Sequence, residues 1–248
     1  MSVVAKEILC SHCSAPVDFK SGEIIATCKY CGFTTVIQTG HSFDFEHSLI
    51  LNNYDQTQME RCVRNWMSSG FMKPSDLAKK SKIIENALVY LPFWVVSVVV
   101  ATNYTGVFDR ISPPVTKDGQ IEKEYNWLIL ARKATVFPTR EYNVPLAGKI
   151  PYDFRKIEGS AKVLNSEIDK DEALELSKQQ IENHHRFLLR QDIDRILEFS
   201  TTLKLKQIVY LHAPIWFIKY QYKNNLYQII LDGSTGSALK GDIPPMRF

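Results

Sequence analysis

Cysteines are few in this sequence and no long uninterrupted apolar run occurs, and each scarcity excludes a class of protein. Only five cysteines occur in 248 residues, and four of them stand in two C-x2-C pairs, which is metal-binding spacing rather than a disulfide framework. The longest apolar stretch, residues 87–101, is interrupted by Pro92 and Ser97 and is shorter than the roughly twenty residues of a membrane-spanning helix. No signal-peptide pattern opens the chain. We therefore expect a cytoplasmic protein with reduced thiols and no transmembrane segment.

An excess of either charge is also lacking, because 30 Lys and Arg residues oppose 27 Asp and Glu residues. The net charge of +3 does not predict a general nucleic-acid binder, although it permits a local basic patch. The sequence contains no P-loop, no dinucleotide-binding glycine motif and no GxSxG motif, so these enzyme classes are not indicated. An apolar fraction of 45% and a charged fraction of 23% are those of an ordinary globular protein.

The strongest signal in the chain is a C-x2-C-x14-C-x2-C motif formed by four cysteines: Cys10, Cys13, Cys28 and Cys31. Four sulfur ligands at this spacing suit a tetrahedral Zn²⁺ site, because each two-residue gap allows a tight turn that aims both sulfurs at one ion. Ser14 and Gly32 follow the two turns and suit their tight backbone. A catalytic zinc keeps one position open for water, and four thiolates leave none. We predict one structural zinc ion in an N-terminal zinc ribbon, residues 1–40.

Helical periodicity marks three further segments. Between a candidate N-cap at Asp55 and a stop at Gly70, one apolar stripe contains Met59, Cys62, Val63, Trp66 and Met67. A second helix is expected over residues 75–85. A long helix is expected to begin at the capping-box pattern Asp169-Lys170-Asp171-Glu172 and to continue to about Leu197.

Strand patterns fill much of the remainder. The valine-rich residues 87–101 indicate a buried strand that ends in a turn at 103–106, and residues 125–137 indicate another strand. Towards the C-terminus we expect two strands joined by a hairpin turn, at residues 215–222, residues 226–231 and Asn224-Asn225.

One internal repeat is visible. The sequence VYLPFWVV at residues 89–96 resembles VYLHAPIWFI at residues 209–218 once two extra residues are allowed for. Each copy follows helical sequence and opens a strand pair, so we infer a duplicated helix–strand unit, at about residues 50–110 and 166–244; chance similarity between two apolar strands is the alternative. The expected fold class is α+β, with the zinc ribbon followed by a mixed domain, residues 41–248, built from two related helix–strand units.

The proline-containing middle of the chain is enriched in cations and aromatic residues, which pair with phosphates and stack on unpaired bases. The ribbon itself is not basic, because its acidic and basic side chains cancel and a zinc tetrathiolate adds about two negative charges. The candidates for contact with nucleic acid or another partner are therefore Arg132, Lys133, Arg140, Tyr142, Lys149, Tyr152, Phe154, Arg155 and Lys156. RNA is a candidate ligand, and a plain surface loop is the alternative.

A second cluster combines His184 and His185 with Asp192 and Asp194, which suits a metal site or acid–base chemistry. On a charged helix such residues more often form a solvated face. They are the sequence support for an alternative function, an enzyme of unknown reaction with a pocket between the two repeated units.

Several short motifs accompany the ribbon: Leu91-Pro92-Phe93-Trp94, Val144-Pro145, Pro151-Tyr152-Asp153, Ala213-Pro214-Ile215-Trp216, Lys219-Tyr220-Gln221-Tyr222 and Asp232-Gly233-Ser234-Thr235-Gly236. Together they resemble a prokaryotic protein family that contains a transcription-factor-IIB-type zinc ribbon. Asp232 and Ser234 depart from the Asn-Gly-Gln-Thr-Gly type of turn that is usual in that family, and the second ribbon of some members is absent. The resemblance implies the architecture described above and transfers no activity.

The closed metal site, the lack of a catalytic motif and the basic, aromatic middle segment lead to one functional hypothesis. We expect a non-enzymatic zinc-ribbon adaptor that docks on a protein or ribonucleoprotein partner, such as the ribosome or the transcription machinery.

Overall fold

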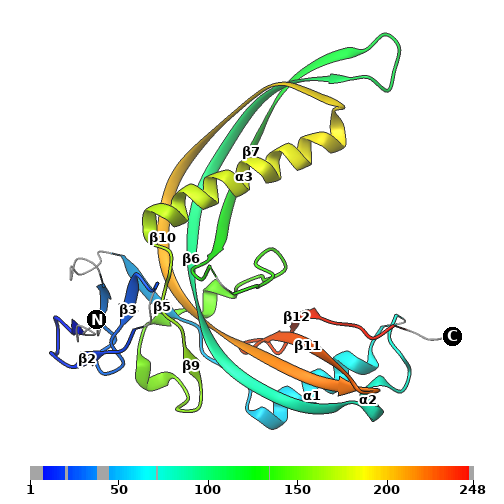
Figure 1. The fold of residues 1–248 in the computed structure, drawn as a ribbon. Helices are drawn as coiled ribbons and strands as arrows, with labels where there is room; N and C mark the ends of the chain where they lie inside the picture. Colours follow the sequence, from blue (N-terminus) through cyan, green and yellow to red (C-terminus); the bar gives the residue numbers. More distant parts are fainter. Residues whose placement is uncertain (1–7, 20–21, 38–44, 71, 134, 246–248) are drawn as a thin grey trace, which may run out of the picture.

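The computed structural model describes residues 8–19, 22–37, 45–70, 72–133 and 135–245. The described residues up to 37 form a small unit of two hairpins, called the ribbon below, and those from 45 onward form a body around one eight-stranded sheet (Figure 1). The fold is mixed helix and strand with more strand than helix, in agreement with the α+β prediction. The boundary expected at residue 40 lies outside the described residues.

Each hairpin of the ribbon carries one cysteine pair at its turn. The antiparallel pairs are β1 (Ile8–Leu9) with β2 (Pro16–Val17), and β3 (Ile25–Thr27) with β4 (Thr34–Val36). The buried core of this unit consists of Cys10, Val17, Ala26 and Cys28. So few apolar side chains do not stabilise a fold by themselves, which is why small units of this kind use a metal ion.

Two very long antiparallel strands form the spine of the body, β6 (Lys82–Phe108) and β10 (Arg195–Tyr222). They pair along almost their whole length, with Lys82 opposite Gln221 at one end and Val107 opposite Arg195 at the other. Three register shifts interrupt the pairing. Such bulges bend strands and increase their twist, and both strands follow the arc seen in Figure 1.

Shorter strands extend the two halves and the middle of this arc. In the upper half of the arc, as drawn in Figure 1, β7 (Val115–Leu130) pairs with β6. In the lower half, β11 (Asn225–Asp232) pairs with β10, and β12 (Ala238–Gly241) pairs with β11 at the edge of the sheet. Near the middle, three short strands join the same sheet: β5 (Glu46–Leu49), β8 (Ile150–Pro151) and β9 (Lys162–Val163).

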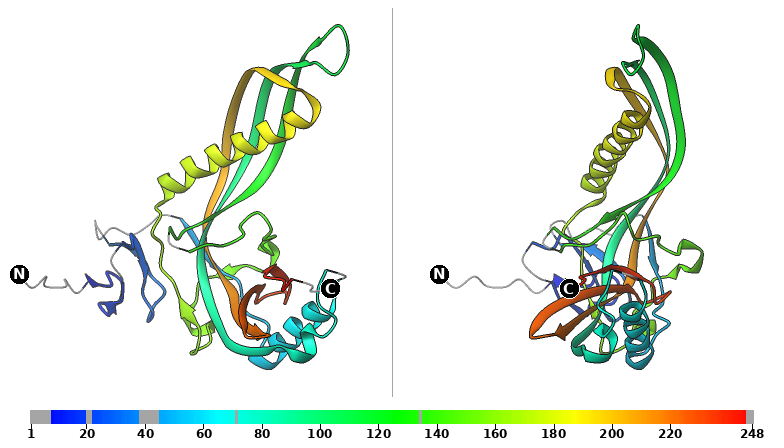
Figure 2. Two further views of the ribbon diagram at one scale, coloured as in Figure 1. Left: turned by 45° about the vertical axis from the view of Figure 1, so that its right-hand side comes forward. Right: turned by 90° about the vertical axis from the view of Figure 1, so that its right-hand side faces the viewer.

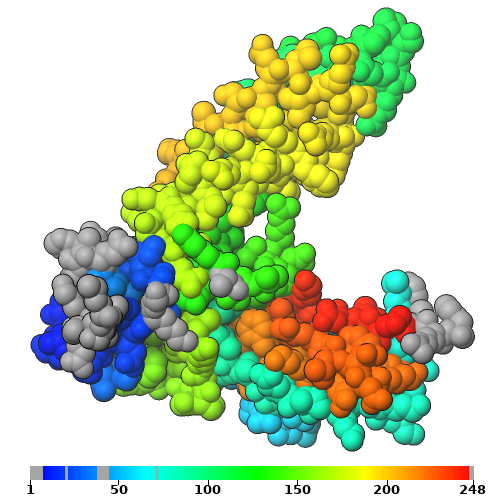
Figure 3. Space-filling model, viewed as in Figure 1, coloured from blue at the N-terminus to red at the C-terminus, as the bar shows by residue number. Residues whose placement is uncertain are grey.

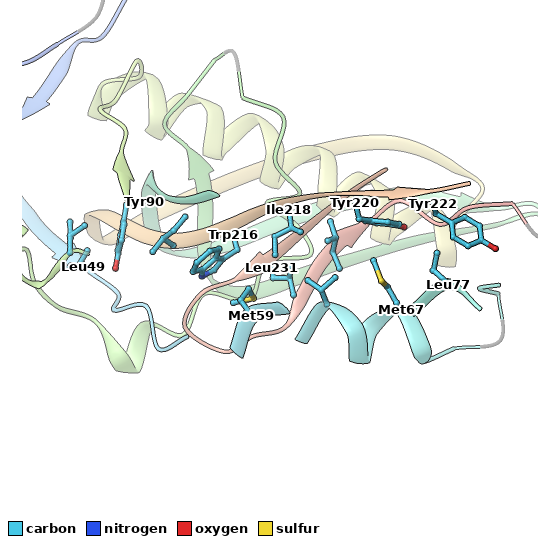
Figure 4. Close-up of a cluster of buried hydrophobic side chains, with 14 residues drawn as sticks. Leu49, Met59, Met67, Leu77, Tyr90, Trp216, Ile218, Tyr220, Tyr222 and Leu231 are labelled. Atoms are coloured by element: carbon cyan, nitrogen blue, oxygen red, sulfur yellow. The ribbon is translucent and has the colours of Figure 1, made fainter. Parts of the chain in front are cut away.

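Helix α1 (Gln56–Ser68) covers the lower half of the sheet. Asp55 caps it in a capping box with Gln58, as the sequence predicts. Its buried stripe packs on side chains of β10 and β11 (Figure 4): Met59, Val63 and Met67 meet Ile218, Tyr220 and Leu231. The short helix α2 (Leu77–Lys80) buries Leu77 in the same core.

Helix α3 (Lys170–Asp192) covers the upper half. The Asp169 side chain accepts a hydrogen bond from the Glu172 backbone N–H and caps its first turn. Ala173 and Ile181 pack in one core cluster with side chains of β6 and β7, including Trp94, Val98 and Ile129. Figure 2 shows that the tip of the β6–β7 hairpin extends beyond this helix.

Two expected helix ends are wrong. The segment expected to be helical as far as Glu85 enters β6 at Lys82, where Ile83 pairs with Tyr220. The long helix ends at Asp192 rather than at Leu197, because Ile196 is already opposite Gly106 in the sheet. Short apolar segments fit both the helical and the strand pattern, and here the pairing with a distant strand decides between them.

Three strand boundaries also differ from expectation. No turn interrupts β6 at residues 103–106, because β7 and β10 both continue to pair there. The strand expected at residues 125–137 runs from Val115 to Leu130 instead. The hairpin turn before β11 is centred on Lys223-Asn224, one residue earlier than expected, and both of these residues have a positive φ.

The order helix–strand–strand occurs twice, as α1-β6-β7, with the short α2 after α1, and as α3-β10-β11. Each helix contacts strands of both sets, since α1 shares a core cluster with side chains of β6, β10 and β11, while α3 contacts β6, β7 and β10. The duplication itself stays a prediction. None of the described helices is long and apolar enough to cross a membrane.

Candidate metal centre

The four cysteines of the ribbon converge on one point. Their sulfur atoms all lie within 4.8 Å of one another, with Cys10 Sγ 3.5 Å from Cys31 Sγ and Cys13 Sγ 3.7 Å from Cys28 Sγ. A tetrahedral ion with metal–sulfur bonds of about 2.3 Å requires sulfur separations of about 3.8 Å. The four side chains are therefore close enough to hold one metal ion.

The two turns that carry the cysteines are built in the same way. In the first, Ser14 N–H donates to the Cys10 carbonyl and Cys10 N–H donates to the Ala15 carbonyl, both at 2.8 Å. In the second, Gly32 N–H donates to the Cys28 carbonyl at 2.9 Å and Cys28 N–H to the Phe33 carbonyl at 2.8 Å. Ser14 and Gly32 both have a positive φ, as expected for the residue that follows each tight turn.

The electrostatics of the cluster call for a cation. Burial raises the pKa of the Cys10 thiol, but hydrogen bonds from the backbone of Cys13 and His12 outweigh it and lower this pKa to about 7. Burial, together with the neighbouring cysteines, raises the pKa of Cys31 to about 12. Four thiolates this close repel one another unless a dication lies between them, and a tetrahedral set of four sulfurs is typical of zinc or iron.

A buried ion-pair network joins the ribbon to the body. The Arg132 guanidinium contacts Glu23 of the ribbon at 3.0 Å and Glu167 of the body at 2.8 Å, and its side chain is only 12% exposed. Asn165 completes the network, because its side-chain amide donates to Glu23 at 2.9 Å and its backbone carbonyl accepts from Arg132 at 3.0 Å. The backbone N–H of Ile25 also donates to the Ser166 carbonyl at 3.2 Å. The ribbon is therefore attached through polar bonds with defined geometry.

A second link runs from the ribbon through two histidines of the sheet, half-buried His47 on β5 and buried His212 on β10. His212 Nε2 lies 3.0 Å from the Leu164 carbonyl, so this nitrogen must carry a hydrogen. In the neutral ring Nδ1 then accepts from His47 Nε2 at 3.0 Å, and His47 Nδ1 accepts from the Thr34 hydroxyl at 2.9 Å. The Tyr152 ring stacks on His47, with centroids 4.0 Å apart.

His47 and His212 both favour the neutral state. Burial, and then the charge of His212, lowers the pKa of His47 well below its ordinary value. Burial lowers the pKa of His212 to about 4, although its hydrogen bond to the Leu164 carbonyl acts in the opposite direction. Neither residue was predicted from the sequence to be functional. The apolar run 208–218 contains His212 as its only polar side chain besides those of Tyr210 and Trp216.

The nine candidates for partner contact do not form one surface. Arg132 belongs to the buried network, Lys133 pairs with Glu172 at 2.9 Å, and Lys149 pairs with Glu46. Arg140 and Tyr142 line a cavity beside α3. The last four lie together opposite the second cysteine turn: Tyr152, Phe154, Arg155 and Lys156.

These last four residues form one wall of a surface groove of about 470 Å³. The other wall is Tyr30, Cys31 and Gly32, and Tyr30 is 59% exposed. Gly32 suits this point because its φ is positive and because an added Cβ would lie 3.3 Å from the Tyr152 ring, a tight contact. Arg155 pairs with Asp153 at 2.9 Å, which reduces the positive charge of the groove. In Figure 3 the ribbon lies at the side of the body.

The His184, His185, Asp192 and Asp194 set is not brought together as one site. His185 is buried, with Nδ1 2.7 Å from the Thr102 hydroxyl and Nε2 2.9 Å from the Tyr125 hydroxyl. Asp194 pairs with Arg110, in the turn between β6 and β7, at 2.9 Å. Only His184 lines a cavity, the one that also contains Arg140.

Comparisons with known proteins add no assignment. The chain matches no protein-family model, no curated protein and no solved structure. The resemblance to proteins with a transcription-factor-IIB-type zinc ribbon stays a prediction.

Proposed function

We propose that this chain is a non-enzymatic zinc-ribbon adaptor, which holds one zinc ion through Cys10, Cys13, Cys28 and Cys31 and docks on a protein or ribonucleoprotein partner. The observation that carries the proposal is the groove between the second cysteine turn and residues 151–156. It adjoins the metal centre, and it presents exposed Tyr30 beside Phe154. Aromatic side chains of this kind are enriched where proteins contact one another.

The attachment of the ribbon supports this reading. A ribbon on a mobile tether has to be ordered when it binds, and that ordering weakens association. Here the buried Arg132 network and the His47–His212 pair set the orientation of the second cysteine turn relative to Tyr152. The groove is therefore formed before a partner arrives.

Charge favours a protein surface over a bare phosphate backbone as the contact. A zinc tetrathiolate contributes about two negative charges next to the groove, and Asp153 compensates Arg155. Of the six candidate cations, Arg132, Lys133, Lys149 and Arg155 already pair with carboxylates. RNA within a ribonucleoprotein then contributes at most a few phosphate contacts.

Affinity capture from cell lysate tests the proposal, with tagged wild type, Tyr30→Ser and the matched control Phe187→Ser. Phe187 is similarly exposed but lies on α3, away from the groove. We expect a stoichiometric partner with wild type and with Phe187→Ser, and its loss with Tyr30→Ser while zinc is retained. A parallel capture after nuclease treatment separates a protein partner from one held through RNA. Recovery of no partner in either condition, or equal recovery with Tyr30→Ser, contradicts the proposal.

A further inference from the structure

An open cavity of about 280 Å³ lies between α3 and β7 and is bounded on a further side by residues 139–142. Its volume is just below the roughly 300–1,000 Å³ that ligand pockets occupy. In Figure 3 the molecule is hollowed below α3, next to the segment that follows β7. The cavity shares no residue with the groove of the proposed adaptor function.

The charge of the cavity has one sign. Arg140 is the only charged residue in its lining, which among the described residues includes no Asp, Glu or Lys. Unlike Arg132, Lys149 and Arg155, Arg140 has no ion-pair partner within the described part of the chain. Burial, and then the positive charges of Arg140 and Lys123, lowers the pKa of His184, so the His184 ring is neutral at pH 7. The lining therefore favours a negatively charged ligand.

One wall of the cavity is aromatic. Tyr125 and Trp127 are two residues apart and lie on the same face of β7, with ring centroids 5.6 Å apart and ring planes at 90°. The His184 ring lies 5.7 Å from the Trp127 ring and 5.9 Å from the Tyr125 ring. The Trp127 indole N–H donates to the Gln180 side chain at 2.9 Å, which holds the indole against α3. A planar apolar ring packs face-on against one such ring and edge-on against its neighbour.

We propose that this cavity binds a small organic carboxylate with a flat apolar body. The carboxylate accepts two parallel hydrogen bonds from the Arg140 guanidinium, whose planar fork matches carboxylate geometry. The ring of the ligand lies against Trp127 and His184. A carboxylate fits better than a phosphate ester because the lining offers one cation and no helix N-terminus to neutralise a second negative charge.

Titration of the full-length chain with benzoate, followed by the indole N–H signals in ¹H–¹⁵N NMR spectra, tests the proposal. A Trp127→Phe variant assigns the Trp127 signal among the four tryptophans. We expect benzoate to shift that signal with a dissociation constant of roughly 1 mM, as suits so small a ligand. Benzylamine has the same ring and the opposite charge, and it should leave the signal unmoved.

Two variants make the result specific. Arg140→Gln should weaken benzoate binding by about tenfold or more, the effect of a lost charge-assisted bidentate contact. Arg140 is exposed and unpaired among the described residues, so this change should leave the fold intact, which the rest of the spectrum verifies. Arg155→Gln, at the groove of the ribbon, should leave benzoate binding unchanged. Equal shifts with benzoate and benzylamine, unaltered affinity in Arg140→Gln, or inorganic phosphate binding as tightly as benzoate would each overturn the proposal.

Discussion

Each cysteine turn places its first cysteine in the core of the ribbon and its second at the surface. Cys10 and Cys28 are buried, whereas Cys13 and Cys31 are exposed. Cys10 and Cys28 directly follow β1 and β3 and pack with Val17 and Ala26 in the ribbon core, whereas Cys13 and Cys31 lie further along each turn. Loss of a buried cysteine therefore removes a metal ligand and a core side chain at once.

Replacement of Cys28 by Ser should abolish zinc binding and unfold the ribbon, while the body stays folded because nearly all of its core side chains come from its own strands and helices. Metal analysis should find one zinc ion per wild-type chain and none in the variant, and limited proteolysis should cut the variant within residues 8–37. Cys62→Ser is the matched control, because Cys62 lies on α1 and this variant should keep the metal. Iron, or no metal, in natively purified wild type would refute the zinc assignment.

At the scale of elements, charged side chains join strands and loops that are far apart in sequence. Arg132 follows the end of β7, Glu23 precedes β3, and Glu167 lies in the segment before α3. All three side chains are largely buried, and two carboxylates share one guanidinium. Removal of the guanidinium takes an ion-pair partner from two buried carboxylates at once, which costs far more than the loss of an exposed ion pair.

Arg132→Ala should lower the free energy of unfolding by about 3–5 kcal/mol. Hydrogen exchange within residues 22–37 should rise first, because the ribbon loses its main polar attachment to the body. Arg155→Ala, which removes an exposed ion pair with Asp153, should cost at most about 1 kcal/mol. Urea unfolding curves of both variants provide the measurement, and similar losses of stability in the two would show that the Arg132 network is not an anchor.

At the scale of the whole molecule, the ribbon meets the sheet near the middle of its arc. There β5 lies beside β10, and the pair His47–His212 connects Thr34 of the ribbon to Leu164 of the body. Every nitrogen of the two neutral rings has a partner. Protonation requires a buried charge and a rearranged hydrogen-bond chain, so acid should loosen the joint between the two parts.

Stability should therefore fall as the pH drops from about 6.5 to about 4. The pKa of His212 is about 4 in the folded chain and 6.5 for an ordinary histidine, so in this interval the unfolded chain binds more protons. The contribution of His212 is fully present above pH 6.5, and about 3 kcal/mol of it is lost by pH 4.

Unfolding measured across this pH range, with zinc held constant, should show a shallower dependence in His212→Gln than in wild type. His12→Gln changes an exposed histidine and serves as the control. An unchanged slope in His212→Gln would exclude the buried pair as the source of acid sensitivity.

The sequence by itself determined the features that depend on near neighbours. The spacing of four cysteines predicted the metal cluster and the strained backbone at Ser14 and Gly32, because two residues between ligands and a tight turn are local geometry. Asp55 and the stripe from Met59 to Met67 predicted α1, and Asp169 predicted the start of α3, since caps and helical faces repeat within four residues.

Tertiary structure alone decided which distant residues meet. The ends of β6 and β10 were set by each other, so helical patterns at residues 83–85 and 193–197 were overridden by pairing between residues far apart in the sequence, Ile83 with Tyr220 and Ile196 with Gly106. The same is true of the cations, since only the fold places Arg132 between Glu23 and Glu167, leaves Arg140 unpaired beside Trp127 among the described residues, and joins His47 to His212. The residue type determines which groups a side chain is able to bind. Its burial, and the neighbours that the fold places beside it, determine which of those groups it binds.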